Sequence, residues 1–148
     1  MENSKQVDLL NQLIEINNDR LEGYDTASGE TSDGDLKGLF TNLKNTSHGC
    51  LQELRSEVNS LGGKPEEGTR VTGKFFRAWM EVKSALTGGD RQTVLNSCEF
   101  GEDKAQEAYE DVLEHSADLS PGQLAMITAQ KARLRADHDR VKALRDAQ

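Results

Sequence analysis

The sequence is poor in the residues that build sheets, cross-links and membrane spans. Its 148 residues include 2 cysteines, 2 prolines and, as aromatics, 4 Phe, 2 Tyr and 1 Trp. Val, Ile and aromatic residues favour strands, so their scarcity beside abundant Leu, Ala, Glu, Lys, Gln and Arg indicates helix. No run approaches the roughly 18 apolar residues of a membrane helix, and no apolar leader follows Met1. We therefore expect an all-α, soluble protein with a cytoplasmic location.

The two cysteines, Cys50 and Cys98, have no spacing typical of metal ligands. Both fall on the apolar stripes of predicted helices, about seven residues apart in height, which corresponds to about 10 Å of helix rise. Disulfide geometry allows Cα atoms only about 4.4–6.8 Å apart. We therefore expect two buried, free thiols.

The charge is acidic overall and unevenly distributed. The formal net charge is −8, with nine acids against two bases in residues 90–119 and six bases against three acids in residues 120–148. A basic C-terminal helix could indicate a polyanion partner, but the chain as a whole would repel a phosphate backbone. We favour an acidic and a basic helix lying side by side, with no nucleic-acid and no membrane partner.

Apolar periodicity predicts four long helices and one shorter helix. Gly29 is expected to close the first helix, Gly62 and Gly63 to stop the second, and Asp90 to cap the fourth. A capping box formed by Ser120 and Gln123, with Pro121 at the first helical position, predicts the start of the last helix. The predicted ranges are about 5–28, 35–61, 72–86, 91–115 and 121–146.

The connection lengths predict the topology. Short turns make the first two long helices one antiparallel hairpin and the last two another. The segment 62–90, which carries the short helix, is long enough to return along the bundle, so residues 35–61 and 91–115 would start at the same end. One long crossover between two hairpins is the ferritin-like four-helix bundle. We expect residues 1–148 to form a single domain of this kind, the alternative being a five-helix array of another connectivity.

Several strings support this fold by resemblance. They are Gly23-Tyr24, the run 84–90 (SALTGGD), the run 98–103 (CEFGED), Tyr109-Glu110 and the run 138–146 (HDRVKALRD). Together they resemble a bacterial family of ferritin-like four-helix-bundle proteins known only as a domain of unknown function. The resemblance spans nearly the whole chain and implies the fold, but no activity. Residues 46–50 (TSHGC) depart from the pattern of that family.

A ferritin-like di-iron centre needs a Glu from two helices and a Glu-x-x-His pair from each of the other two, all facing inward. The first helix offers only Asn17 at mid-height, with Asp19 and Glu22 predicted to face solvent. In the second helix, Asn45 and His48 are predicted to point outward. These two helices therefore do not provide the expected ligands.

The other two long helices each provide one candidate ligand. Glu102 lies within an apolar stripe with Glu99 on its edge, and His138 faces inward with Arg135 where a bridging carboxylate would stand. Asn17, Ser47, Glu102 and His138 are predicted within about one turn of each other in height. We favour a structural, hydrogen-bonded pair of Glu102 and His138 helped by Asn17 and Ser47. The alternative is a degenerate metal site with Glu102 and His138 as ligands.

The sequence therefore leaves two functional hypotheses. The first is a non-enzymatic bundle without a complete di-iron site and without a cofactor. Its expected partner is a second copy of the chain, bound through the crossover helix around Phe75, Phe76 and Trp79. The second is a divergent protein that binds a divalent or iron-type metal through Glu102 and His138. No nucleophile is arguable from the spacing of residues, so no catalytic residue is predicted.

Overall fold

The computed structural model describes residues 2–68, 74–88 and 90–148. This part of the chain is helical, as its sequence predicts, and contains no strand. Its elements are α1 (Glu2–Glu30), α2 (Gly34–Ser60), α3 (Lys74–Gly88), α4 (Arg91–Leu113), a short 3-10 helix η1 (Ser116–Asp118) and α5 (Pro121–Asp146).

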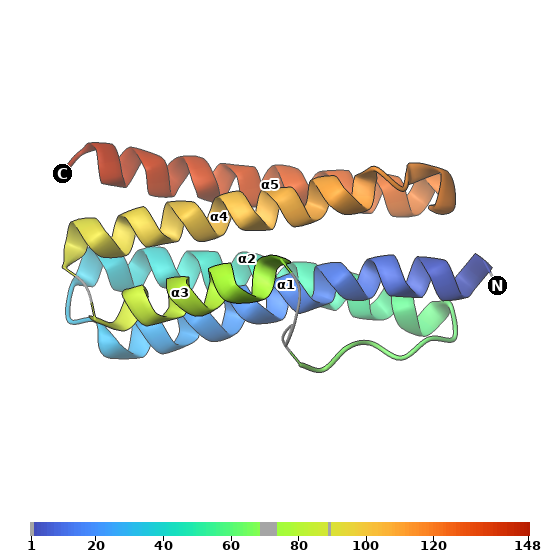
Figure 1. The fold of residues 1–148 in the computed structure, drawn as a ribbon, viewed down its shortest axis with the longest axis horizontal. Helices are drawn as coiled ribbons and strands as arrows, with labels where there is room; N and C mark the ends of the chain where they lie inside the picture. Colours follow the sequence, from blue (N-terminus) through green and yellow to red (C-terminus); the bar gives the residue numbers. More distant parts are fainter. Residues whose placement is uncertain (1, 69–73, 89) are drawn as a thin grey trace.

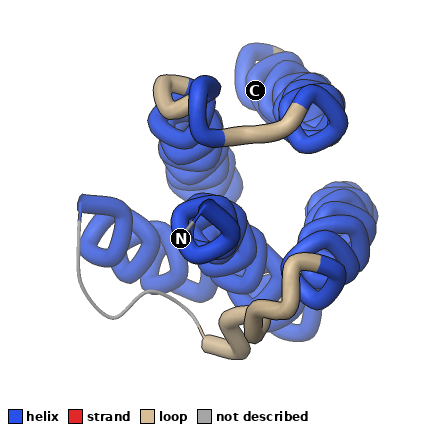
Figure 2. The backbone as a smooth tube through the Cα atoms, turned by 90° about the vertical axis from the view of Figure 1, so that its right-hand side faces the viewer, coloured by secondary structure: helices blue, strands red, loops and turns tan. Residues whose placement is uncertain are grey.

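The long helices form two antiparallel hairpins, α1 with α2 and α4 with α5 (Figure 1). The segment after α2 returns along the bundle and leads into α3, so α2 and α4 both start at the end where the C-terminus lies. This arrangement confirms the crossover topology and excludes a layout in which α2 and α4 run in opposite directions. Seen along its length, the bundle has α3 on one side of α1 and α2 on the other (Figure 2).

The helix ends follow the local signals in the sequence, with one exception. Asp90 accepts a hydrogen bond from the backbone N–H of Thr93 at 2.8 Å, and Ser120 with Gln123 forms the predicted capping box. Gly62 ends α2 with a φ of 78°, in the left-handed region that favours glycine. The prediction for Gly29 was wrong, because α1 continues through it to Glu30 and its φ is not positive.

Helix α3 covers the groove between α1 and α4 by inserting Trp79, which is 1% exposed. Gly101 allows this close approach, because a Cβ there would lie only 3.2 Å from the indole. A Cβ on Gly23 would lie 3.7 Å from the indole, at an ordinary van der Waals distance. The Tyr24 ring meets the indole edge-on, with the ring centroids 6.1 Å apart. The side chains of Phe75 and Phe76 lie outside the described residues.

The acidic helix α4 and the basic helix α5 lie side by side, as their charges predict. Arg145 pairs with Glu99, and the Lys131 ammonium lies 3.6 Å from the Glu110 carboxylate. Among the residues that the structure describes, no helix is both long and apolar enough to cross a membrane.

Both thiols are free and buried, which confirms the prediction for Cys50 and Cys98. Burial raises the pKa of each thiol, and at Cys98 the negative charge of Glu102 raises it further. The reactive species is the thiolate, so both folded thiols are expected to react with a maleimide far more slowly than free cysteine at pH 7. Labelling followed by mass spectrometry measures this, with the urea-unfolded chain as control. Rapid labelling of the folded chain at either thiol would contradict the burial described here.

Candidate functional site: a polar centre inside the bundle

An arginine lies at mid-height in the bundle, completely buried. Arg20 is three residues after Asn17 and four before Tyr24, so all three share the inward face of α1. Its guanidinium holds the Glu102 carboxylate of α4 with two hydrogen bonds, Nε to Oε2 at 3.0 Å and Nη2 to Oε1 at 2.8 Å. Both side chains are 0% exposed. The result is a two-pronged ion pair, the strongest arrangement for these groups.

Glu102 has a third donor in Tyr24, whose hydroxyl donates to Oε2 at 2.6 Å. Burial and the neighbouring carboxylate raise the pKa of Tyr24, so the phenol stays protonated. For Arg20, burial alone would lower the pKa, but the charge of Glu102 outweighs it and the pKa is raised. The guanidinium therefore stays cationic, and three hydrogen bonds hold the Glu102 carboxyl group in place.

Hydrogen bonds extend from this pair through all four long helices. Arg20 donates to the Ser47 hydroxyl, which donates to the Asn17 amide oxygen at 2.9 Å. The Asn17 amide donates to the Tyr109 hydroxyl at 2.9 Å, and that hydroxyl donates to Gln130 at 2.7 Å. We use the name polar centre for the residues of this network together with Tyr24, Glu102 and Asp137; the network consists of Asn17, Arg20, Ser47, Tyr109 and Gln130. Each hydrogen bond between two helices requires that they keep a fixed position along each other's length, so the network specifies the register of the helices.

The polar centre continues to the surface between α2 and α5. The Gln130 amide donates to the Glu53 carboxylate at 2.9 Å, and Arg133 donates to the same oxygen at 2.6 Å. Asp137 adds a second carboxylate near Arg20, at 3.4 Å from Nη2. The buried positive charge therefore faces two acids, and the network ends on an exposed ion pair.

The structure does not join Glu102 to His138, contrary to the structural pairing expected from the sequence. His138 faces inward and is 6% exposed, but its Nε2 lies 2.7 Å from Asp103 and its Nδ1 lies 3.2 Å from Asp139. Glu99 pairs with Arg145. Because Arg20 donates hydrogen bonds to both carboxylate oxygens of Glu102, His138 pairs instead with carboxylates closer to the surface.

Asn17 and Ser47 lie in the polar centre, as predicted, and Asn45 and His48 are exposed, as predicted. The prediction that Asp19 faces solvent was wrong. Asp19 is 3% exposed and lies 3.1 Å from the Lys83 ammonium, because α3 packs against this side of α1. Burial raises the pKa of Asp19 despite that ion pair.

Sequence reasoning missed Arg20, Gln130 and Asp137. The spacing did contain a signal for two of them: Arg20 follows Asn17 by three, and Gln130 lies three after Ile127 and four before Leu134. Gln130 is 0% exposed, and Asp137 is 5% exposed beside His138. The burial of these charged and amide side chains is difficult to predict from sequence, because their hydrogen-bond partners lie on other helices.

The polar centre differs from a di-iron donor set in charge and in composition. A di-iron centre gathers four carboxylates and two imidazoles around cations, whereas here a guanidinium already neutralises Glu102. Within residues 2–68, 74–88 and 90–148, no three or more His, Cys, Asp or Glu side chains are arranged to hold a metal ion. The residues present therefore do not fit a di-iron cluster.

The fold and this centre define the class: a ferritin-like helical bundle with an internal ion pair at its middle. The chain belongs to the family described as a domain of unknown function, DUF2383, whose sequence profile matches residues 5–115. This confirms the resemblance inferred from the sequence. No curated protein matches the chain significantly.

A solved structure of similar fold is a mutant of Dps1 from Mycobacterium smegmatis. It superposes with a TM-score of 0.78 over 97% of each chain, at 17% sequence identity. At that identity the likeness shows a shared fold, and it confirms the ferritin-like class.

Proposed function

We propose that this chain is a non-enzymatic, self-associating ferritin-like bundle in which Arg20 provides the positive charge that metal ions provide in di-iron bundles. The observation that carries the proposal is the two-pronged contact of Arg20 with Glu102, both fully buried. An arginine side chain is effectively always protonated, so its charge cannot be removed to make room for a metal. A metal at Glu102 would have to displace it.

The alternative is a metal site formed by Glu102 and His138. Its support is that both side chains are buried and lie on neighbouring helices. Against it stand the contacts of each residue, since Glu102 is bound by Arg20 and Tyr24 and His138 by two aspartates. Two ligands with other partners are a poor set for zinc, which takes at least three protein ligands.

Chelation separates the two functions. We expect the melting temperature of the protein to be the same with EDTA as after loading with iron, manganese or zinc, because a ligand that binds the native state would raise it. Calorimetry measures the temperature, and elemental analysis measures the bound metal. A loss of several degrees in EDTA, restored by one metal and absent in His138→Ala, would establish the alternative. His48→Ala is the matched control, because His48 is exposed.

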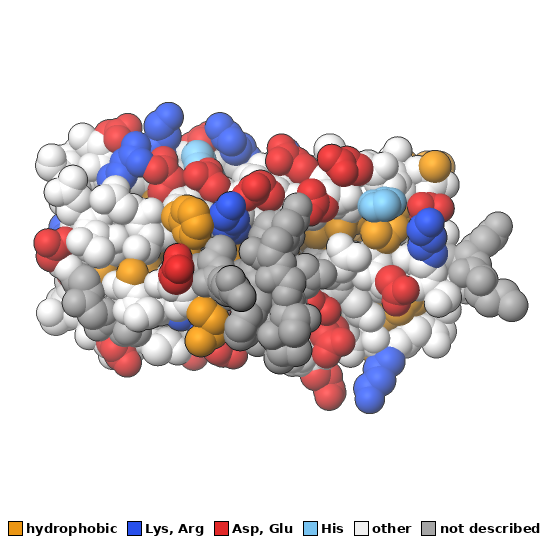
Figure 3. Space-filling view, viewed as in Figure 1, with side chains coloured by type: hydrophobic (Ala, Val, Ile, Leu, Met, Phe, Trp, Pro, Cys, Tyr) orange, Lys and Arg blue, Asp and Glu red, His pale blue; other side chains and the backbone are white. Residues whose placement is uncertain are grey.

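For self-association, exposed apolar side chains on α3 and α4 support a surface other than one centred on Trp79. Trp79 is buried inside its own chain and cannot contact a partner. The exposed large apolar side chains among the described residues are Met80 on α3, at 51%, and Phe100 on α4, at 41%. Glu81 of α3 and Phe100 of α4 line one hollow, and we call the surface around these two residues the α3–α4 face; Figure 3 shows apolar atoms between charged ones on this side of the molecule.

We expect the protein to sediment as an oligomer at micromolar concentration and Phe100→Gln to shift it toward the monomer. Removing an exposed ring costs little stability but removes an apolar anchor of the kind that dominates interfaces. Sedimentation velocity over a concentration series measures the effect. A wild-type chain that stays monomeric at every concentration would refute self-association.

A further inference from the structure

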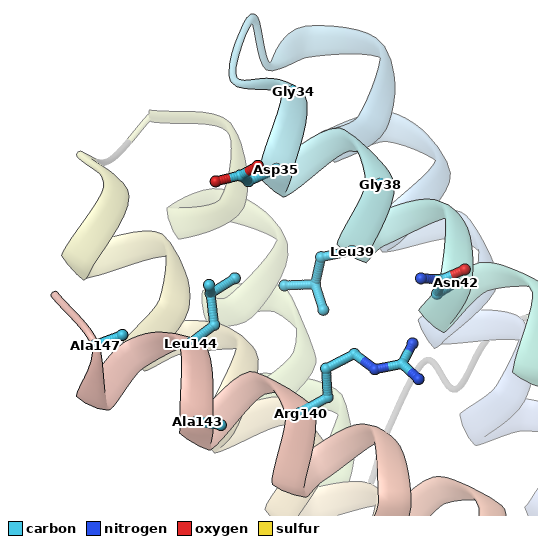
Figure 4. Close-up of a pocket in the computed structure, with 9 residues that line it drawn as sticks. All are labelled: Gly34, Asp35, Gly38, Leu39, Asn42, Arg140, Ala143, Leu144 and Ala147. Carbon is cyan, nitrogen blue, oxygen red and sulfur yellow. The ribbon is translucent and has the colours of Figure 1, made fainter.

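On the opposite side of the bundle, α2 and α5 leave a groove of about 670 Å³ (Figure 4). Leu39 and Leu144 point into it, and small residues and backbone form much of its walls. A Cβ on Gly34 or on Gly38 would touch nothing within 4 Å. The groove is therefore open and largely apolar, and a side chain of another molecule can reach its floor.

The groove also presents a positive charge. Arg140 extends into it beside Asn42 (Figure 4) and is exposed. Among the described residues, no carboxylate is paired with Arg140, although the chain carries a net charge of −8. Asp35 also lines the groove, but its carboxylate is paired with Arg91 at 3.4 Å, so the unpaired charge of the groove is that of Arg140. Its occupant should therefore combine an apolar group with an acidic one.

The α3–α4 face has these two properties. Phe100 is its apolar group, and Glu81 is exposed with no ion-pair partner in the described part of the chain. Glu81 and Phe100 also line one hollow of about 310 Å³ between α3 and α4, so the acid and the ring lie close together. In Figure 2, α3 lies on one side of the bundle and the pair α2 and α5 on the other.

We infer that the α3–α4 face of one copy docks into the α2–α5 groove of a second copy, with Phe100 over Leu39 and Leu144 and Glu81 paired with Arg140. The inference rests on the proposed self-association and specifies its geometry. The two surfaces differ and lie on opposite sides, so the contact is head-to-tail. Repetition of such a contact gives a closed ring or a growing filament rather than a symmetric dimer.

A mixing experiment tests the head-to-tail geometry. Gly38→Trp places an indole in the groove at a position where a Cβ meets nothing within 4 Å, and Phe100→Gln removes the anchor. Each variant alone is expected to be monomeric, whereas an equimolar mixture forms a 1:1 dimer, because the ring of the first chain fits the open groove of the second. Sedimentation velocity measures this, with Lys37→Trp, next in α2 and outside the groove, as the matched control.

Charge reversal tests the ion pair. Glu81→Arg and Arg140→Glu should each weaken association at least about tenfold, because each brings like charges together across the interface, and the double variant should recover most of the loss. If the wild type is oligomeric but Gly38→Trp leaves it unchanged, or the mixture stays monomeric, the head-to-tail inference is wrong while self-association stands. A monomeric wild type would overturn both.

Discussion

Replacing Arg20 by methionine is expected to lower the free energy of unfolding by about 3–5 kcal/mol, the largest effect of any single substitution in the polar centre. The change leaves the Glu102 carboxylate buried without its two charged hydrogen bonds, and an unpaired charge in the interior is penalised far more than a pair is rewarded. Both side chains are 0% exposed, so water cannot compensate for the lost partner. Urea denaturation followed by circular dichroism measures the loss.

Two controls show whether the loss comes from the buried contact. Arg133→Met removes an arginine that lies 2.6 Å from Glu53 but is 43% exposed, and it should cost no more than about 1 kcal/mol. Arg20→Lys keeps the charge but cannot form the two-pronged contact, so we expect an intermediate loss. Equal losses for Arg20→Met and Arg133→Met would show that burial of the ion pair has no special role.

Replacing Trp79 by alanine is the second large change, with an expected cost of about 3–5 kcal/mol. Trp79 connects α3 to both hairpins, because it lies against Gly23 of α1 and Gly101 of α4. Without the indole, α3 loses its largest buried side chain and a cavity opens between these glycines. We expect α3 to detach at lower urea concentration than the rest of the bundle, which hydrogen exchange at α3 amides would detect.

Trp79→Phe separates volume from the polar group. The indole Nε1 is buried with no hydrogen-bond partner among the described residues, so losing it removes an unfavourable feature while the phenyl ring retains much of the packing. Trp79→Phe should therefore cost about half as much as Trp79→Ala. Met80→Ala, one position along α3 at 51% exposure, should change stability by no more than about 0.5 kcal/mol. A large loss for Met80→Ala would contradict the orientation of α3 described here.

The sequence predicted the fold well because its information is local. Caps such as Asp90 and Ser120, the glycine stop at Gly62 and the apolar stripes each involve residues within one or two turns, and the lengths of the connections then decide the topology. The prediction that Gly29 ends the first helix was wrong because a glycine can end a helix but does not have to. The backbone N–H of Thr31 still bonds to the Ala27 carbonyl at 3.0 Å, so the helix continues.

The polar centre could be predicted only in part because its contacts are not local. Spacing placed Asn17, Ser47 and Glu102 inside correctly, but each buried polar group chooses its partner across helices, where sequence gives no distance. Arg20 is 82 residues from Glu102 in the sequence. Arginine side chains are mostly exposed in proteins, so the sequence does not predict that this one faces inward. His138 was paired with Glu102 by height alone, although Asp103 and Asp139 lie nearer.

We propose that Arg20 and Glu102 form a pair that holds the bundle together in place of a metal. A double-mutant cycle tests it most directly: Arg20→Met, Glu102→Met and the double variant, each unfolded in urea with EDTA present. The account predicts that the double variant is more stable than Arg20→Met, with a coupling free energy of about 2–3 kcal/mol or more, because removing both charges removes the desolvation penalty. Additive losses in the double variant would show that the two side chains do not act as a pair and would contradict the account.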